Sequence, residues 1–420
     1  MSVSKTTLSN GLTIVSYAMP QVRSISLGLW FNVGSRDESP DQAGLTHFME
    51  HMMFKGTSTK GPLEISMHFD KLGAEFNAFT SKEYTCYYAR FVDDKLEDAL
   101  SVLAEMVIDS QFKQDAINTE REVVIEEIAR SEDTPDDYVF ELYNSSTFSA
   151  HSLGVPVLGT RERVGSYTHD DCCDFHNEHY HAGNLVLAAA GNLDHDHLVN
   201  LAQSLFASIK PGCRTKRILE VPLFRSGLYC AKRDTEQAHL IYGFPWYGVG
   251  DERRYAGSVL TTLLGGSMSS RLFQEVREKR GLAYSIYATQ ATYQGAGQWC
   301  VYAGTRLANM GEVVQVIQQE IEGLTTTLVP QDELERTIDF ICGQLLLGLE
   351  TTNSHMGRLG KREVLGLEQI SPEQQVESYR GVTADQVLRV AQEFLTCSPG
   401  IAVVSSSDQQ EIESLLSHNK

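Results

Sequence analysis

The chain has 420 residues, 42% hydrophobic and 21% charged, so it is long and apolar enough to bury more than one core. Its formal net charge of −20, from 55 acidic and 35 basic residues, argues against binding to nucleic acid or to an anionic membrane surface. No run of 18 or more apolar residues is present, so we expect no membrane-spanning helix. The start, MSVSKTTLSNGLTIV, lacks the pattern of a secretory signal, and the eight scattered cysteines are typical of reduced thiols. We therefore expect a cytoplasmic protein.

The first chemically informative segment is the pentad His47-Phe48-Met49-Glu50-His51. Helix positions four apart lie on one face, so His47 and His51 can offer two imidazole nitrogens to one metal ion. Glu50 lies on the same side, where it can hold a water molecule. The pattern His-x-x-Glu-His is the inverted zinc-protease motif. The alternative is a buried helix with two hydrogen-bonded histidines.

A strand follows over residues 84–92, which are rich in the β-formers Tyr, Thr and Val. The next long helix, over residues 115–130, has an apolar stripe formed by Ile117, Val124 and Ile128. Glu120 and Glu127 both lie on one edge of this stripe, whereas Glu126 lies opposite to it. A hydrolytic zinc site needs three protein ligands, and this helix is the best candidate to supply the third. The alternative is that Glu120 and Glu127 pair with Arg121 or with lysines.

Two other segments invite functional interpretation. His176, His179 and His181, close to Cys172 and Cys173, have metal-like spacing and form a rival site, although a structural role is favoured. The run Gly265-Gly266-Ser267 is not a phosphate loop because no Gly-Lys-Ser/Thr follows, and it predicts a helix boundary.

The chain contains two similar halves. The strand-like runs 25–31 and 238–244 are offset by 213 residues, and the later runs 183–194 and 399–408, compared at their ends, are offset by 214. This spacing indicates a duplicated unit with its join near residues 210–212, so we expect halves at 1–212 and 213–420. The offset maps the polar residues of the pentad onto Leu260, Leu263 and Leu264. The first half is therefore predicted to be catalytic and the second to be degenerate and free of metal.

These segments resemble the M16 (pitrilysin-type) metallopeptidases. The resemblance rests on the pentad, on REVVIEEIARSEDTPDD, and on GLTHFMEHMMFKGT (44–57), NAFTSKEYTCYYA (77–89), SLGVPVLGT (152–160) and RLFQEVREKRGLAYSI (271–286). It covers nearly the whole chain, whose length suits the short branch that includes mitochondrial processing peptidase. It implies one zinc ion per chain, bound by His47, His51 and Glu127, with Glu50 as the general base.

The same resemblance implies further site residues and a fold. Glu120 would support the zinc site, and Arg277 and Tyr284, which are seven residues apart, would act on the substrate. The implied fold is α+β, with two tandem halves that each have a mostly antiparallel sheet and helices on one face. The implied substrate strand pairs with an exposed edge at Asn77, Ala78, Phe79 and Thr80, although the residues alone fit a simple loop equally well.

The expected function is zinc-dependent endopeptidase activity on peptides or unfolded polypeptide segments. In the family, two tandem-half units enclose a chamber, and the Arg/Tyr pair comes from the unit that faces the zinc. Because this chain carries both the zinc motif and Arg277 with Tyr284, we expect a homodimer; the alternative is a heterodimer with another chain. The alternative function is a catalytically silent structural or partner subunit, but such chains typically lose ligands that this chain retains.

Overall fold

The computed structural model describes residues 3–217 and 219–417, which form two compact units. The first unit comprises Met1–Ile128, Val155–Ile218 and Leu347–Gln369, and the second comprises Ala129–Gly154, Leu219–Leu346 and Ile370–Lys420. All eight cysteines are free thiols. In the described part of the chain, we find no helix with the length and apolar character that crossing a membrane requires.

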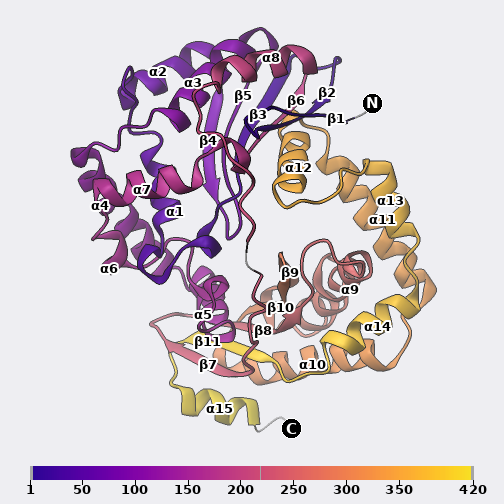
Figure 1. Ribbon diagram of the computed structural model, residues 1–420. Helices are drawn as coiled ribbons and strands as arrows, with labels where there is room; N and C mark the ends of the chain where they lie inside the picture. The colour runs from indigo at the N-terminus through magenta and orange to yellow at the C-terminus, as the bar shows by residue number, and fades with distance from the viewer. Residues whose placement is uncertain (1–2, 218, 418–420) are drawn as a thin grey trace. The chain divides into compact units, whose positions relative to one another are not determined.

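The first unit is built on a six-stranded sheet, labelled in Figure 1. In spatial order its strands are β1 (Val3–Thr7), β2 (Thr13–Ala18), β6 (Leu185–Gly191), β3 (Ser24–Phe31), β5 (Thr85–Val92) and β4 (Glu75–Thr80). All neighbours are antiparallel except β2 and β6, which are parallel. β4 is therefore an edge strand.

The second unit repeats this arrangement with five strands. In spatial order they are β7 (Gly227–Lys232), β11 (Gly400–Ser405), β8 (Ala238–Trp246), β10 (Ala296–Thr305) and β9 (Ala283–Tyr293). The one parallel pair, β7 and β11, occupies the same place as β2 and β6 in the first sheet. Both the mostly antiparallel sheets and the internal duplication predicted from the sequence are confirmed.

Helices pack against each sheet. Those of the N-terminal half are α1 (Leu45–Met52), α2 (Pro62–Leu72), α3 (Leu96–Ile108), α4 (Gln114–Glu132), α5 (Pro135–Thr147), α6 (Arg161–Val164), α7 (His169–His179) and α8 (His195–Leu205). Those of the C-terminal half are α9 (Arg254–Gly265), α10 (Met310–Thr326), α11 (Gln331–Gly348), α12 (Thr352–Val364), α13 (Pro372–Arg380), α14 (Ala384–Phe394) and α15 (Gln409–Ser417). A π-helical segment spans Phe273–Glu278. Short 3-10 turns lie at Ser35–Asp37, Pro40–Gln42, Asp93–Lys95, Ser152–Gly154, Ala182–Asn184 and Leu307–Asn309.

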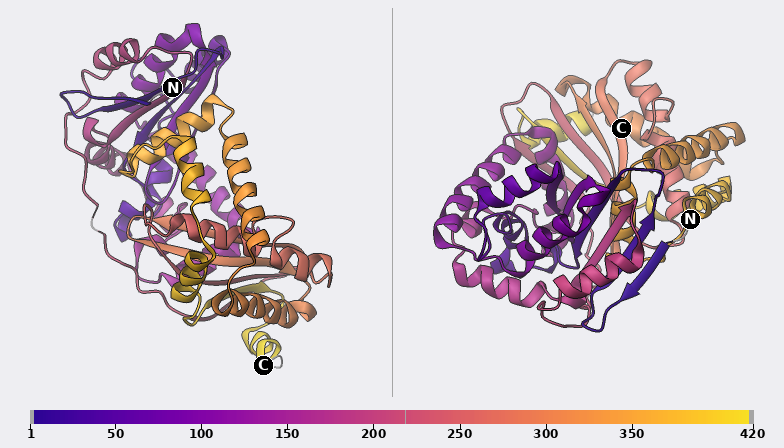
Figure 2. Two further views of the ribbon diagram at one scale, coloured as in Figure 1. Left: turned by 90° about the vertical axis from the view of Figure 1, so that its right-hand side faces the viewer. Right: turned by 90° about the horizontal axis from the view of Figure 1, so that it is seen from above.

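The first sheet is covered on both faces, because helix α12 from the C-terminal half lies against the face opposite to the main core (Figures 1 and 2). Along β3, alternate residues such as Leu27 and Leu29 belong to the main core. The residues between them face α12: Ser26 Oγ is 2.8 Å from Thr352 Oγ1, and Trp30 packs so closely on Gly360 that a Cβ there would come within 2.2 Å of its ring. This double coverage explains why β3 is almost entirely buried.

The second sheet receives the reciprocal cover from α5, which belongs to the N-terminal half of the chain. Val139 and Tyr143 of α5 form a cluster with Ile241 of β8, whereas Leu240 lies in the core on the other face. The predicted boundary after residue 212 thus describes the order of the halves along the chain. The compact units differ from these halves in two segments. Ala129–Gly154, which contains α5, belongs to the second unit, and Leu347–Gln369, which contains α12, belongs to the first. Each sheet consequently has helices on both faces, one more layer than the sequence analysis expected.

Candidate metal site

Helix α1 is largely buried, but it carries the polar side chains of the pentad on one face. Leu45, Phe48, Met49 and Met52 are all buried in the first core. At its N-terminus Gly44 has φ +93°, and a Cβ there would come within 2.6 Å of the Leu158 carbonyl oxygen. The two carboxylate oxygens of Glu38 accept hydrogen bonds from the N–H groups of Gly44 (2.9 Å) and Thr46 (2.7 Å). The start of α1 is thereby fixed, which orients the pentad.

Three side chains converge on one point between α1 and α4. Glu127 Oε2 is 3.8 Å from His47 Nε2 and 3.5 Å from His51 Nε2. One donor atom from each of the three residues lies within 4.8 Å of the others, and within residues 3–217 and 219–417 this is the one such group of His, Cys, Asp or Glu. The predicted ligand set is therefore brought together, entirely within the first unit.

These separations fit a zinc ion. Zinc bonds to nitrogen and oxygen of about 2.0–2.1 Å in tetrahedral geometry place two ligand atoms about 3.3–3.4 Å apart. The observed donor separations of 3.5 and 3.8 Å are only slightly larger. Two imidazoles and one carboxylate form a three-ligand set that leaves a fourth position open, as in catalytic rather than structural zinc sites.

Glu120 contacts the His51 imidazole at Nδ1, on the side of the ring away from Glu127. Its buried carboxylate lies 3.1 Å from His51 Nδ1 through Oε2 and 2.6 Å from Lys55 Nζ through Oε1. Burial raises the pKa of Glu120, but its hydrogen bonds with His51 and Lys55 reverse this effect, and the pKa lies below its usual value. A carboxylate at Nδ1 fixes the proton there and turns the Nε2 lone pair toward Glu127. This placement fits the supporting role that the sequence analysis predicted for Glu120, which also forms the lysine pair that the sequence left open.

The other two polar residues of the pentad differ in their surroundings. Burial, followed by the proximity of His51, lowers the pKa of His47 to about 3, so its imidazole is neutral near pH 7. Burial raises the pKa of Glu50, against an opposing hydrogen bond from Thr80 Oγ1 at 2.5 Å. A neutral imidazole suits metal binding, and a carboxylate with a raised pKa suits proton transfer near neutral pH.

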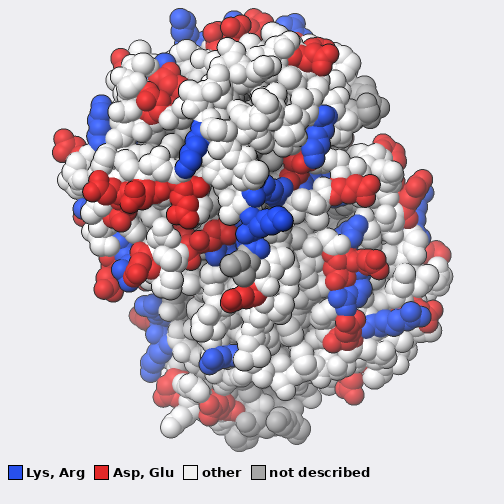
Figure 3. Space-filling model, viewed as in Figure 1, with Lys and Arg blue, Asp and Glu red and all other residues white. Residues whose placement is uncertain are grey.

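Helix α4 has the predicted phase. Ile117, Val124 and Ile128 are buried, Glu120 and Glu127 lie on the side that faces α1, and Glu126 is exposed. Figure 3 shows acidic side chains gathered where α4 lies in Figure 1, and exposed Asp115, Glu122 and Glu126 belong to this helix. The choice of Glu127 over Glu126 therefore agrees with the helix geometry.

The segment Asn77–Thr80 belongs to edge strand β4 and is not a simple loop. Phe76, Ala78 and Thr80 share the face toward α1 and α2, where the rings of Phe76 and Phe69 stack. Asn77 and Phe79 are on the opposite face, and the Phe79 ring contacts Trp30 and Tyr84. The Asn77 side chain accepts a hydrogen bond from its neighbour's backbone, Ala78 N–H, at 2.8 Å.

Arg277 and Tyr284 lie together in the second unit. The Arg277 guanidinium, in the π-helical segment, stacks 4.8 Å from the ring centre of Tyr284, the second residue of β9. Tyr284 is 78% exposed, which is high for an aromatic side chain. A π-helical segment is often found at functional sites, but its presence does not by itself assign a role.

The rival histidine cluster does not form a metal site. His176 Nε2 is 2.8 Å from the Val107 carbonyl oxygen, and its ring stacks on Tyr180. His179 packs on Phe175, while His181 contacts Gly212. These histidines have structural contacts. The Gly265-Gly266 run ends α9, as predicted, and Gly265 allows α9 to approach the β9 backbone at Ala288.

The sequence analysis missed three contacts at the site. They are those of Glu38 with the start of α1, of Lys55 with Glu120, and of Thr80 with Glu50. Lys55 follows His51 by four positions, so helical spacing is a signal that could have suggested it. No local pattern connects Glu38 to Gly44 or Thr80 to Glu50, because these contacts depend on how separate elements pack.

Known proteins resemble the chain throughout its length. Residues 13–161 match the family model described as insulinase (peptidase family M16), and residues 166–340 match the one described as peptidase M16 inactive domain. An uncharacterized zinc protease of Streptomyces coelicolor is 41% identical over 96% of this chain and 89% of its own length. An uncharacterized zinc protease of Bacillus subtilis is 40% identical over 96% and 98%, respectively.

Solved structures have the same fold. A protease from Helicobacter pylori has a TM-score of 0.87 and 22% identity, covering 96% of this chain and 99% of the other. A structure from Pseudomonas fluorescens described as a peptidase M16 inactive domain has a TM-score of 0.91 and 21% identity, covering 97% and 99%. At this identity the similarity establishes the fold alone.

Proposed function

Because this chain belongs to the M16 peptidase family, we propose that it is a zinc-dependent endopeptidase that hydrolyses peptides or unfolded polypeptide segments. The observation that carries this proposal is the convergence of His47, His51 and Glu127, whose donor atoms lie within 4.8 Å of one another beside Glu50. The uncharacterized zinc proteases at about 40% identity support the reaction class.

Each residue at the site has a role in this proposal. His47, His51 and Glu127 would bind one zinc ion, which supplies Lewis-acid chemistry for the scissile carbonyl and for a water molecule. Glu50 takes a proton from the attacking water and returns it to the nitrogen of the leaving amine. Glu120 holds His51 Nδ1, so the imidazole keeps one tautomer and one orientation.

The proposed substrate-binding element is edge strand β4, over Asn77, Ala78, Phe79 and Thr80. An edge strand has unpaired backbone groups on one side, so an extended peptide can add to it by main-chain hydrogen bonds. Such binding reads the backbone more than side chains and excludes folded proteins. The Asn77 amide, which now bonds to Ala78 N–H, would have to release that donor to an incoming strand.

We also propose a homodimer that encloses a chamber, with each active site completed by Arg277 and Tyr284 of the second copy. The support is that one chain carries both the zinc ligands and this pair, and that Tyr284 is 78% exposed. Tyr284 would donate a hydrogen bond to the carbonyl oxygen during attack, and Arg277 would bind substrate backbone or carboxylate. The eight free cysteines support a reducing compartment such as the cytoplasm.

The test uses purified protein, metal analysis and an internally quenched, unstructured peptide. We expect about one zinc per chain and cleavage that a chelator abolishes. Glu50→Gln should retain the metal and lower kcat by at least about a hundredfold, because it removes the base but spares the ligands. Near-normal turnover of Glu50→Gln would exclude the mechanism. Zinc binding without cleavage by the unmodified chain would favour the alternative, a silent partner subunit.

A further inference from the structure

The carboxylate of Glu50 has one hydrogen-bond partner among the described residues, the hydroxyl of Thr80. The Thr80 Oγ1–Glu50 Oε2 distance is 2.5 Å. Glu50 follows His47 by three positions and precedes His51 by one, so its backbone position is set by α1. The rotation of its carboxylate is not set by the helix, and in this structure Thr80 is the group that holds it. A hydrogen bond to a charged group is among the stronger polar contacts in proteins.

Thr80 is the last residue of edge strand β4 and reaches Glu50 because of its strand phase. Phe76, Ala78 and Thr80 point to one face. Phe76 anchors that face by packing on Phe69 of α2 and Phe54. The hydroxyl of Thr80 is thus aimed at α1 by the packing of the strand, and the strand that we propose as the substrate platform also contacts the proposed base.

The turn that follows Thr80 is held by backbone contacts. The Ser35 N–H donates to the Ser81 carbonyl at 3.1 Å, and the Arg36 N–H donates to the Lys82 carbonyl at 2.8 Å. Gly34 lies so close to this turn that a Cβ would come within 2.4 Å of Glu83 N. The β4–β5 turn is therefore fixed against the segment that precedes α1.

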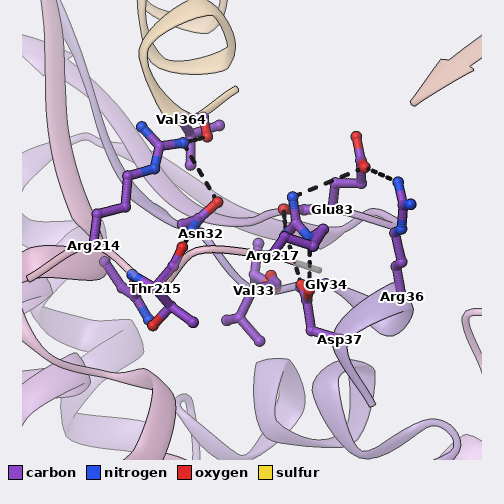
Figure 4. A network of polar contacts seen from close by, with 12 residues as sticks. Asn32, Val33, Gly34, Arg36, Asp37, Glu83, Arg214, Thr215, Arg217 and Val364 are labelled. Carbon is purple, nitrogen blue, oxygen red and sulfur yellow. Dashed lines mark hydrogen bonds and ion pairs between the residues drawn. The ribbon is translucent and has the colours of Figure 1, made fainter. Parts of the chain in front are cut away.

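Side chains of the same turn also take part in a buried network of ion pairs (Figure 4). Glu83 Oε1 lies 2.6 Å from Arg36 Nη1, and both side chains are almost fully buried. Arg217, in the connection between the halves, donates to Asp37 through Nε and Nη2, both at 2.6 Å, and to the Glu83 carbonyl oxygen at 2.8 Å. Desolvating four charged side chains is costly, and such networks are often retained for the geometry they impose. Here that geometry is the position of the hairpin end carrying Thr80.

We infer that Thr80 is a positioning residue that orients the Glu50 carboxylate for proton transfer, and that the Arg36–Glu83–Arg217–Asp37 network holds it in place. This inference rests on the proposed function. It assigns the Thr80 side chain to the base, whereas the backbone of β4 remains the platform for the substrate strand. Loss of the hydroxyl should therefore lower kcat and leave KM nearly unchanged.

The test compares Thr80→Val, which is nearly isosteric but lacks the hydroxyl, with Thr80→Ser, which keeps it. Thr80→Val should lower kcat by about tenfold or more with KM within about twofold, and Thr80→Ser should recover most of kcat. Zinc content and thermal stability of both variants should match the parent. The matched control is Thr292→Val on β9, the edge strand of the second sheet, which should leave kcat unchanged.

A rise in KM without a fall in kcat would overturn the inference, because it would assign the Thr80 hydroxyl to substrate binding. An equal loss of kcat in Thr80→Ser and Thr80→Val would also overturn it by pointing to packing alone. Arg217→Met provides a second test, since releasing the turn should lower kcat in the same direction while zinc affinity stays within about twofold. If Glu50→Gln is inactive but Thr80→Val turns over normally, the positioning role fails and the proposed function stands.

Discussion

Helices α1 and α9 occupy equivalent places in two sheets of the same strand order, yet they differ completely in chemistry. In α1 His47, Glu50 and His51 are only partly buried, and His47 and His51 face Glu127. In α9 the corresponding Leu260, Leu263 and Leu264 are almost fully buried in the second core. The fold therefore accepts either a polar cluster or an apolar core at this position.

The difference shows what a metal site demands of this scaffold. Fully burying a leucine side chain contributes about 1.5–3 kcal/mol, whereas buried imidazole and carboxylate groups lose hydration that must be replaced. At α1 the replacement comes from Glu120, Lys55, Thr80 and, in our proposal, zinc. The polar cluster of α1 should therefore respond to metal and pH in a way that the leucines of α9 do not.

The largest expected effect comes from removing the ligand on α4. Glu127→Gln should weaken zinc binding by about a hundredfold or more, since zinc would lose its only carboxylate ligand. Glu126→Gln, one position away on the exposed face, should leave affinity unchanged. Competition with a chromophoric chelator measures both. The reverse pattern would mean that the ligand role belongs to Glu126.

The second effect is the pH dependence that His47 of α1 contributes. In metal-free protein the pKa of folded His47 is about 3, compared with about 6.5 in an unfolded chain. At pH values below about 6.5 His47 therefore binds a proton in the unfolded state but not in the folded state. Its contribution to the free energy of unfolding falls as pH decreases, by about 2 kcal/mol at pH 5. Because the raised pKa of His51 acts in the opposite direction, we compare variants instead of absolute slopes.

The control for this effect places leucine at position 47, as α9 has at the corresponding Leu260. His47→Leu should remove the contribution of His47 to the loss of stability between pH 7 and pH 5. His51 and the other histidines are retained in both proteins. Denaturant unfolding of metal-free protein at the two pH values provides the measurement. Equal pH dependence in the parent and in His47→Leu would contradict a buried neutral His47.

A third prediction uses the division of the proposed machinery between the halves. Glu50→Gln and an Arg277→Ala/Tyr284→Phe double variant should each be nearly inactive alone. Mixed under conditions that allow subunit exchange, they should recover about a quarter of the parent activity, because half of the dimers are mixed and each has one intact site. Exchange demonstrated without recovery would contradict the trans arrangement.

The smallest effect concerns Lys55, which contacts Glu120 behind the proposed ligand His51. Lys55→Met should weaken zinc binding by about tenfold, because Glu120 would lose the partner that holds its second oxygen. Lys55→Arg should retain most of the affinity. Lys60→Met, which breaks a lysine pair with Glu105 away from the site, serves as the control. Equal affinities in all three variants would show that His51 alone fixes Glu120.

Much of the candidate site is predictable from local sequence because it depends on helical spacing. The distance from His47 to His51 along one helix, and the phase of Glu120 and Glu127 beside the buried stripe of α4, follow from 3.6 residues per turn. The duplication is also visible in the sequence, since equivalent strands recur at a nearly constant offset. The helical features are found in the structure as predicted because the geometry of the helix backbone alone determines them.

Other features were decided only by the tertiary structure. The exchange of α5 and α12 between the units, the carboxylate of Glu38 at the start of α1, and the contact of Thr80 with Glu50 join segments far apart in the chain. The apolar pattern of β3 indicates that both faces are covered but not which helix covers the second face. Local spacing determines which side of an element a residue faces, whereas its partner depends on the long-range packing that brings two elements together.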